Sequence, residues 1–265
     1  MTPDDLSRLE TPDMSGNTPS EPLAPRSSWP KHVAVIMDGN GRWAEERGES
    51  RILGHRQGAE SVRRIVEHGR RLGLEAVTLY SFSSENWKRP KPEVDALMTL
   101  CAEHLVQERP TLLKNDVRLR RIGRDDNMPE HVLEEIARTE EATAHCTGMT
   151  LVLAINYGSR AEITDACRSL CQDVKTGTLE PDSITEEHLA GRLYTAGLPD
   201  PDLLIRTAGE RRISNYLLWQ ISYAEIHISD VNWPDFDEGC LNRAIDDYAS
   251  RTRRFGAVPE KSSES

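Results

Sequence analysis

A single segment near the N-terminus places an acidic residue, a glycine-rich turn and a basic residue in succession. An apolar run at residues 33–37 ends at Asp38, and the turn Gly-Asn-Gly-Arg occupies residues 39–42. Glycines permit positive φ and a close approach of the backbone, so the N–H groups of such a turn can face an anion. Asp38 can share that anion only through an intervening cation, for which Mg²⁺ is the ordinary choice. The segment therefore predicts a metal-assisted phosphate or diphosphate site, although an Asp-Gly turn is also common in structural loops.

A second set of candidate phosphate ligands lies at residues 206–214. Arg206 and Arg212 can each pair a guanidinium fork with phosphoryl oxygens, and Ser214 adds a hydroxyl group. The competing interpretation is that Arg212 and its neighbour Arg211 are solvated surface charges. Another basic set lies close to the glycine-rich turn and comprises Arg42, Arg51 and His55. The competing interpretation of His55 is a histidine near a helix N-terminus that bonds to backbone. Two basic sets predict two bound diphosphates, and hence a reaction between two such substrates.

Two further regions are candidates for the same site. Glu225 precedes an apolar run at residues 226–228 and could complete a metal site with Asp38, although a carboxylate in such a position is more often a surface residue or a cap. The loop at residues 83–90 is polar except for Trp87. Tryptophans belong to the core by default, and this one is the clearest exception in the chain. The loop is therefore a candidate substrate contact.

The elements that must position these residues alternate between strands and helices. Apolar runs predict strands at residues 33–37, 76–82, 117–122, 149–155, 203–206 and 225–228. Helical spacing predicts helices at residues 54–72, 93–115, 129–145, 159–175, 215–222 and 237–255. Pro110 should kink or end the second helix, and a capping box at Ser183 and Glu186 should begin a further short one. The alternation favours an α/β fold with a mainly parallel sheet, whose strand ends would bring the polar groups to one edge.

Composition limits the class of protein. Of 265 residues, 37% are hydrophobic and 29% charged, and no apolar run reaches membrane-spanning length. The formal net charge of -11 argues against a general nucleic-acid binder, which needs a broad basic face. The 5 cysteines include no CxxC pair, which favours reduced thiols in the cytoplasm. Residues 1–29 and 257–265 have little to bury and predict disordered tails around one catalytic domain at residues 30–256.

Five separated motifs together resemble one family. They are DGNGRW at residues 38–43, FSSENWKRP at 82–90, NYG at 156–158, RTAGERRISNYLLWQISYAE at 206–225 and NWPDF at 232–236. In this order they are similar to the motifs of the bacterial cis-prenyltransferases of the undecaprenyl diphosphate synthase type. The resemblance runs from about residue 29 to residue 256, and five ordered motifs make it far more specific than an isolated DGNG.

The resemblance implies a homodimer whose subunits each contain a six-stranded, mainly parallel sheet surrounded by helices, with an apolar tunnel for the product. Enzymes of this family use Mg²⁺ and condense isopentenyl diphosphate repeatedly onto an allylic diphosphate such as farnesyl diphosphate, making each new double bond cis. We therefore expect a cytoplasmic enzyme with a long product near undecaprenyl diphosphate, the lipid carrier of cell-wall synthesis. Peripheral contact with a membrane would accompany product release. A short- or medium-chain product remains the alternative.

The resemblance also implies roles for single positions. Asp38 and Glu225 match the carboxylates of the metal site. Asn86 matches the residue assigned as proton acceptor, but an amide is a weak base, so it could instead position the substrate while a diphosphate oxygen takes the proton. The remaining matched positions are Gly39, Asn40, Gly41, Arg42, Trp43, Arg51 and His55 for the allylic diphosphate; Ser83, Ser84, Glu85, Trp87 and Arg89 in the substrate-contacting loop; and Arg206, Arg212, Ile213 and Ser214 for isopentenyl diphosphate.

A few positions bear on affinity and product length. The chain departs from the family motifs at Ser159 and Ala208, where glycine is usual, and at Asn232, where leucine is usual. The methyl group of Ala208 is expected to crowd the backbone near the isopentenyl diphosphate. Small side chains at Ala59 and Val62 would leave room in the tunnel, and Met149 matches its floor, although all three could simply be core residues.

Three other functions agree less well with the sequence. An aspartyl phosphatase generally needs a second aspartate two positions after the nucleophile, where this chain has Asn40. A nucleotide-binding dehydrogenase needs GxGxxG after the first strand, and that pattern is missing. A non-catalytic partner subunit of the cis-prenyltransferase type tends to lose the metal aspartate and the loop residues, whereas Asp38, Asn86 and Glu225 are all present. An active transferase is therefore predicted.

Overall fold

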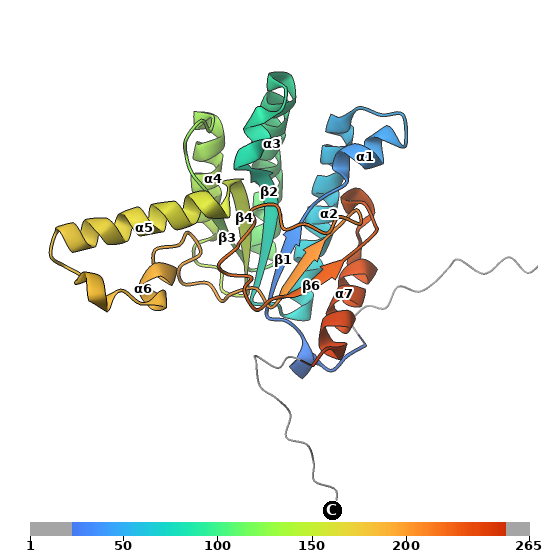
Figure 1. The fold of residues 1–265 in the computed structure, drawn as a ribbon. Coiled ribbons are helices and arrows are strands. Elements are labelled where there is room, and N and C mark those ends of the chain that lie inside the picture. Colours follow the sequence, from blue (N-terminus) through green and yellow to red (C-terminus); the bar gives the residue numbers. More distant parts are fainter. Residues whose placement is uncertain (1–22, 253–265) are drawn as a thin grey trace, which may run out of the picture.

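The computed structural model describes residues 23–252, and its centre is a parallel β-sheet (Figure 1). The sheet has six strands in the order β3-β4-β2-β1-β5-β6, and every neighbouring pair is parallel. Their bounds are β1 His32–Ile36, β2 Ala76–Ser83, β3 Val117–Ile122, β4 Met149–Tyr157, β5 Leu203–Arg206 and β6 Glu225–Ile228. The predicted six-stranded sheet is confirmed. All five residues of β1 are buried, as expected for a parallel strand covered on both faces.

The strand order reverses direction at β1. After β1 the chain builds β2, β3 and β4 on one side, and it later adds β5 and β6 on the other. Ile36 of β1 pairs with Arg206 of β5, so the carboxyl ends of these two strands lie side by side. Open α/β sheets form a crevice outside the strand ends at such a switch point. The fold thus brings the residues after Ile36 and those after Arg206 to one place.

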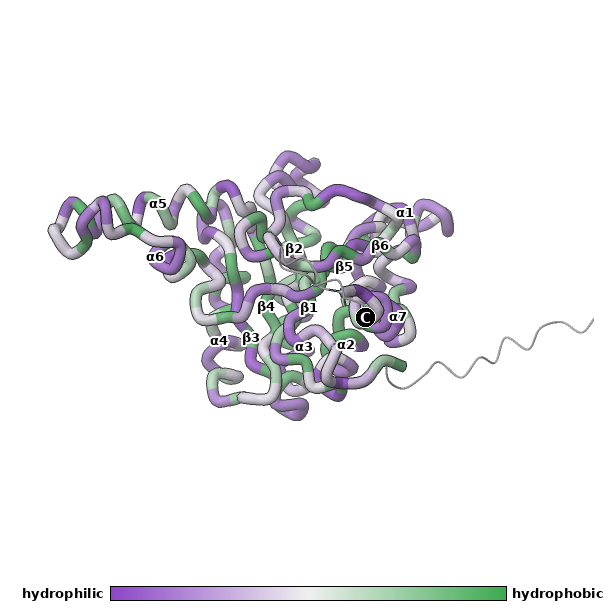
Figure 2. The backbone as a smooth tube through the Cα atoms, turned by 60° about the horizontal axis from the view of Figure 1, so that its bottom comes forward, coloured by the Kyte–Doolittle hydropathy of each residue, from purple (hydrophilic) through white to green (hydrophobic). Residues whose placement is uncertain are grey.

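Helices cover the sheet unequally (Figure 2). The main apolar cluster joins α2 (Arg51–Leu72), α3 (Lys91–Lys114), α4 (Glu130–Thr143) and α7 (Glu238–Ser250) to one face of the strands. A smaller cluster on the other face contains Tyr157, Tyr216 and Leu217. The helices α5 (Ser159–Lys175) and α6 (Glu186–Ala190) reach away from the sheet (Figure 1). None of the helices within residues 23–252 combines the length and apolar character that a membrane span requires.

Two sequence-based predictions about helices are wrong. Residues 215–222 form turns, because Ser214, Asn215 and Leu217 have φ of 48°, 60° and 46°, which an α-helix does not allow. The helix α3 continues through Pro110 to Lys114, as its predicted range requires, so only the alternative that Pro110 ends a part of the helix is excluded and the kink stays a prediction. Pro110 is exposed there, so water can reach the carbonyl group that loses its N–H partner.

The second wrong prediction concerns α6. Its N-terminal cap is Thr185, paired reciprocally with His188, and not Ser183 with Glu186. Ser183 instead ends the short 3₁₀-helix η4 (Pro181–Ser183).

The folded domain begins earlier than the composition predicts. Ala24 donates its N–H to Oδ1 of Asp246 in α7 at 2.8 Å, and Trp29 donates its indole N–H to the carbonyl of Ala24 at 2.8 Å. Residues 26–28 form the short helix η2 (Arg26–Ser28). Within residues 23–29, which are predicted to be disordered, Ala24 therefore contacts α7. The rest of the predicted N-terminal tail, the predicted C-terminal tail and the last residues of the predicted final helix lie outside the described residues.

Candidate active site

Asp38 lies just beyond the carboxyl end of β1, where Thr207 holds its backbone. The hydroxyl of Thr207 accepts the N–H of Asp38 at 2.8 Å and donates to the carbonyl oxygen of Asp38 at 2.6 Å. Thr207 is fully buried and directly follows β5. The carboxylate Oδ1 accepts the N–H of Gly39 at 2.8 Å. Neighbouring strands thus fix both the position and the direction of the carboxylate.

Arg206 connects Asp38 to the second predicted phosphate set. Its Nη2 donates to Oδ2 of Asp38 at 2.7 Å, and its Nη1 donates to Oγ of Ser214 at 2.7 Å and to the carbonyl oxygen of Arg212. The Arg206 side chain is only 4% exposed, and its buried Nε has no hydrogen-bond partner. Nη2 of Arg212 lies 3.7 Å from Oδ2 of Asp38. The structure therefore brings Asp38, Arg206, Arg212 and Ser214 together, as predicted.

The two basic sets are neighbours, because Glu210 links them. Arg42 donates to Oε1 of Glu210 at 3.0 Å, and Arg212 pairs with Oε2 of the same carboxylate. These two guanidinium groups, Arg42 first, hold the pKa of Glu210 below its usual value. Arg42 also donates to the carbonyl of Ala208 at 2.9 Å. Two half-exposed arginines therefore flank the Asp38–Arg206 pair from opposite loops.

Glycines in α2 allow the glycine-rich turn to approach. The turn continues directly into α1 (Asn40–Glu45), whose N-cap Gly39 has a φ of 97° that favours glycine. A Cβ on Gly54 would lie 2.0 Å from the carbonyl oxygen of Asn40, and one on Gly58 would lie 2.2 Å from Oδ1 of Asn40. That Oδ1 is buried without a hydrogen-bond partner. In the same way, Gly41 leaves room for the guanidinium of Arg51.

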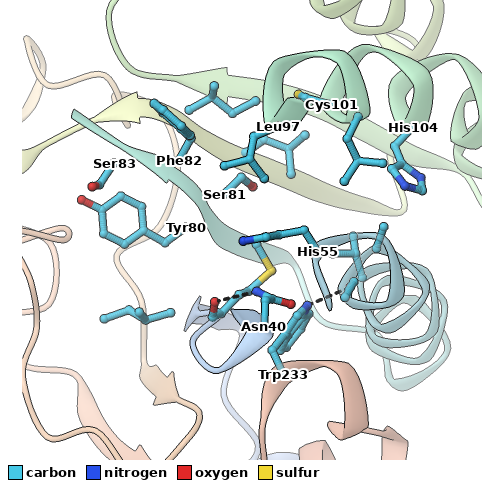
Figure 3. Close-up of a pocket in the computed structure, with 18 of the residues that line it drawn as sticks. Asn40, His55, Tyr80, Ser81, Phe82, Ser83, Leu97, Cys101, His104 and Trp233 are labelled. Atoms are coloured by element: carbon cyan, nitrogen blue, oxygen red, sulfur yellow. Dashed lines mark hydrogen bonds between the residues drawn. The ribbon is translucent and has the colours of Figure 1, made fainter. Parts of the chain in front are cut away.

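His55 is a neutral polar group at the cavity wall. Burial, followed by the positive charge of Arg89, lowers its pKa from 6.5 to about 4. Its buried Nε2 has no partner within residues 23–252, so the predicted alternative of a backbone cap is not observed for this atom. Figure 3 shows the side chains around the cavity, with Asn40 and Trp233 on one side and Leu97, Cys101 and His104 of α3 on another.

The predicted substrate loop is the short 3₁₀-helix η3 (Ser84–Lys88). Oδ1 of Asn86 accepts the N–H of Ser83 at 3.0 Å, so the Asn86 amide closes a capping box at the start of this turn. Glu85 accepts from Nδ2 of Asn215 at 2.9 Å, which ties the turn to the loop that follows β5. Arg89 donates to Glu93 at 3.0 Å at the start of α3. The turn is therefore anchored to three other segments of the site.

An apolar cavity of about 740 Å³ opens from these polar groups. Asp38, Arg206 and Arg212 lie at one end, and the walls come from the sheet, α2 and α3. The other predicted site residues that line it are Asn40, His55, Ser83, Glu85, Asn86, Arg89 and Ser214. The apolar lining consists mainly of Ala59, Val62, Val66, Leu97, Met98, Leu100, Cys101, Leu105, Leu112, Leu119, Leu151, Leu153 and Ile155. The cavity joins a charged mouth to a hydrocarbon-compatible interior.

Some predicted residues lie outside this lining. Met149 is buried, but it does not line the cavity, because its sulfur packs towards Gly69 of α2. The indole N–H of Trp43 donates to Asp235 at 2.7 Å, away from Asp38, and its ring stacks under Arg47. The predicted residues that surround the lining without being part of it are Gly39, Gly41, Arg42, Arg51, Ser84, Trp87 and Ile213.

Within one chain, Glu225 does not reach Asp38. Glu225 pairs with Leu203 at the amino end of β5 and β6, three residues before the Arg206 level, which is about 10 Å along the strands. Its carboxylate accepts from Arg251 at 2.8 Å. The two carboxylates therefore do not meet within a single chain, because Glu225 starts its strand whereas Asp38 follows the end of its own, and their shared metal site stays a prediction.

Sequence reasoning missed several residues that position the site. The sequence indicates Thr207, Asn215 and Asn156 only as members of the family motifs. The four-residue spacing of Gly54 and Gly58 in an otherwise regular helix was a usable signal of close packing. The hydrogen bonds of Thr207 and Asn156 join segments far apart in the chain, so no local pattern could reveal them.

Comparison with known proteins agrees with this geometry. Residues 36–256 match the family model described as putative undecaprenyl diphosphate synthase. Isoprenyl transferase from Rhodopirellula baltica is 52% identical over 229 residues, covering 86% of this chain and 94% of that protein. Isoprenyl transferase from Geobacter sulfurreducens is 49% identical over 227 residues, covering 86% and 92%.

Solved structures show the same fold. Lavandulyl diphosphate synthase from Lavandula x intermedia, crystallised with dimethylallyl diphosphate, superposes with a TM-score of 0.85 at 35% identity, covering 87% of this chain and 99% of that one. A probable undecaprenyl diphosphate synthase from Campylobacter jejuni gives a TM-score of 0.71 at 36% identity, covering 86% and 98%.

Proposed function

Because this chain belongs to the undecaprenyl diphosphate synthase family of isoprenyl transferases, we propose that it condenses isopentenyl diphosphate repeatedly onto an allylic diphosphate to make a long cis-polyprenyl diphosphate. The observation that carries the proposal is the junction of the Asp38–Arg206 pair with the apolar cavity. A substrate with a diphosphate at one end and a hydrocarbon chain at the other fits both parts. Farnesyl diphosphate is the proposed primer.

The two basic sets would hold the two diphosphates. Arg206, Arg212 and Ser214 converge on one point and would bind isopentenyl diphosphate through bidentate contacts. The turn at residues 39–42, with Arg51 and His55 beside it, would bind the allylic diphosphate above the cavity that accepts its chain. Because Glu210 links Arg42 to Arg212, the two diphosphates would lie next to each other. Such placement would align the two reacting carbons, which is a proximity effect.

Asp38 fits a Mg²⁺ ion shared with a diphosphate. Within residues 23–252, no group of three or more His, Cys, Asp or Glu side chains is arranged to hold a metal by itself. Mg²⁺ commonly binds through one carboxylate together with phosphate oxygens and water, so the half-buried Asp38 at the mouth suits this mode. With Mg²⁺ bound there, charge developing on the departing diphosphate would be neutralised. The arginines would stabilise the same charge.

Asn86 is better placed to position substrate than to remove a proton. Its amide oxygen already accepts the N–H of Ser83, and it lines the cavity near Asp38. An amide has no basic nitrogen, so the proton lost from the condensing carbon would pass to an oxygen of the released diphosphate. Asn86 would orient the double bond during this step.

The cavity can hold part of a long product. Its lining along α3 runs from Leu97 to Leu112, about 22 Å at the helical rise. Each five-carbon unit adds four bonds to the chain, roughly 5 Å when extended. About four extended units would therefore fill that length, and a longer product would have to fold within the cavity or pass beyond Leu112.

We also propose that the protein is a homodimer. The edge strand β6 has exposed apolar side chains at and before its start, with Ile226 46% exposed and Tyr223 73% exposed. Glu225 lies between them and could join a metal site with Asp38 only if it came from a second copy. Light scattering should give the mass of two chains, and Ile226→Asp should reduce it to one. A wild-type protein that is monomeric at micromolar concentration would contradict this proposal.

The experiment that tests the function is an incubation of the purified protein with Mg²⁺, farnesyl diphosphate and labelled isopentenyl diphosphate, with products separated by length. A ladder ending in a long product, abolished by EDTA and restored by Mg²⁺, is expected. A ladder that ends at a short product would support prenyl transfer but refute the proposal of a long product. No incorporation with dimethylallyl, geranyl or farnesyl diphosphate would refute the proposed function.

A further inference from the structure

Asn156, at the carboxyl end of β4, uses its whole side chain to join two other segments. Its Nδ2 donates to the carbonyl oxygens of Arg124 at 3.0 Å and Asp126 at 2.7 Å. Its Oδ1 accepts the indole N–H of Trp87 at 2.7 Å. The residue is 6% exposed and has a φ of 52°, a left-handed conformation that asparagine tolerates better than most residues. Two donors, one acceptor and this backbone conformation together specify asparagine.

Trp87 transmits that attachment to the mouth of the cavity. Trp87 follows Asn86 within η3. Its ring packs edge-on against that of Phe82, with the ring centroids 4.9 Å apart. Phe82 and Asn86 both line the cavity. The pairing between β2 and β4 is irregular at Phe82, so the sheet ladder alone does not hold this end of β2 in register. The bond to Asn156 supplies a fixed point directly after the irregularity.

We infer that Asn156 is a positioning residue for prenyl transfer, which holds η3 through Trp87 so that Asn86 stays at the cavity mouth. The kinetic part of this inference rests on the proposed function. The attachment of η3 to β4 does not, and it can be measured without substrate. Asn156 itself does not line the cavity, so its effect must pass through Trp87.

Two substitutions isolate the attachment. Asn156→Gly keeps the left-handed backbone free of strain and removes all three side-chain bonds. Trp87→Phe keeps an aromatic ring against Phe82 and removes only the N–H donor. Each should lower kcat about tenfold, and the double variant should be no slower than Asn156→Gly alone. The KM for isopentenyl diphosphate should change less than about twofold, because Arg206, Arg212 and Ser214 do not touch Asn156.

Asn127→Gly is the matched control. Asn127 lies in the loop that Asn156 contacts, has a φ of 63° and is exposed. The same change of residue type at the same kind of backbone position should leave kcat unchanged. A general loosening of this loop would affect all the variants, whereas loss of the attachment would affect only those at Asn156 and Trp87.

Hydrogen exchange followed by mass spectrometry tests the attachment independently. Peptides covering residues 84–88 should exchange faster in Asn156→Gly and Trp87→Phe than in wild type or Asn127→Gly. If the wild type makes no product but exchange rises in both variants, the proposed function fails and the attachment stands. Unchanged exchange in Trp87→Phe would overturn the inference even if Asn156→Gly does not fold. Effects of the two substitutions that multiply in the double variant would also overturn it.

Discussion

Arg206 and Asp38 form an ion pair, 2.7 Å between Nη2 and Oδ2, across the carboxyl ends of β5 and β1. The guanidinium is almost entirely buried, whereas 31% of the Asp38 side chain remains exposed at the cavity mouth. The exposed part of the Asp38 carboxylate is available to a metal, and the buried charge of Arg206 lies beside the place where an anion would bind that metal. The pair is therefore the centre on which the other site residues converge.

Replacing Asp38 should abolish turnover without unfolding the protein. In Asp38→Asn the amide oxygen can still accept from Arg206, but the buried guanidinium loses its charge partner, so the free energy of unfolding should fall by roughly 3 kcal/mol, less than the total stability of a typical domain. Loss of the metal-binding charge should lower kcat/KM roughly 10³-fold. The control is Asp95→Asn, which removes an exposed partner of Lys91 on α3. Near-normal activity in Asp38→Asn would contradict the metal role.

Thr207 should affect activity through the position of Asp38. Thr207→Val removes the hydroxyl that bonds both the N–H and the carbonyl of Asp38, so that these groups keep only their bonds to the carbonyl of Ile36 and the N–H of Trp233. We expect the free energy of unfolding to fall by about 2 kcal/mol and kcat by about tenfold, measured by urea denaturation and steady-state kinetics. Thr164→Val, which removes an exposed hydroxyl bonded to the carbonyl of Arg160, should change neither. Full activity in Thr207→Val would show that Asp38 is positioned without the hydroxyl of Thr207.

Ala208 is strained, and glycine should relieve it. Its φ is 63°, in a region that costs an L-residue roughly 1 kcal/mol or more. Ala208→Gly should therefore raise the free energy of unfolding by about 1 kcal/mol, despite the greater freedom of glycine in the unfolded chain. Ala137→Gly, on the exposed surface of α4, should have the opposite sign and lower it by about 1 kcal/mol. Two changes of the same sign in a urea titration would refute the strain at Ala208.

His55 should make stability dependent on pH. Its pKa is about 4 in the folded protein, lowered by burial and by Arg89, against about 6.5 in the unfolded chain. Between these values the unfolded state binds more protons, so the free energy of unfolding falls as the pH is lowered from about 6.5 towards 4. The variant His55→Gln lacks this contribution. Between pH 7 and pH 4.5 its free energy of unfolding should therefore fall by about 2 kcal/mol less than that of the wild type.

Urea titrations at both pH values, compared between variants, measure that difference. The exposed His131→Gln on α4 should follow the wild type at both pH values. Equal losses for wild type and His55→Gln would mean that His55 becomes protonated in the folded protein as readily as in the unfolded chain.

The length of the cavity should set the length of the product. Leu112 lines the far part of the cavity along α3, whereas the adjacent Leu113 is 39% exposed. Leu112→Trp should shorten the longest product and leave the first condensation unchanged, because the mouth is about 22 Å away along the helix. Leu113→Trp should give the wild-type product ladder. An unaltered ladder in Leu112→Trp would place the growing chain elsewhere.

Local sequence patterns determined much of this protein. Apolar runs predicted the central strands, because a buried parallel strand is apolar on both faces, whereas the edge strands Val117–Ile122 and Glu225–Ile228 also carry polar residues. The polar residues that follow those runs, such as Asp38 and Arg206, were predictable as one site, since parallel strands end at one edge. The ordered motifs identified the family before any coordinates were considered.

Only the tertiary structure decided how those residues act. The helix expected at residues 215–222 does not form, because hydrogen bonds of Asn215 to α5 and to Glu85 stabilise a left-handed turn over local propensity. Within one chain, the register of β5 and β6 keeps Glu225 away from Asp38, and no local pattern encodes that register. The hydrogen bonds of Thr207 to Asp38 and of Asn156 to Trp87 join residues more than sixty positions apart. Such long-range bonds form only once the sheet has brought the strand ends together.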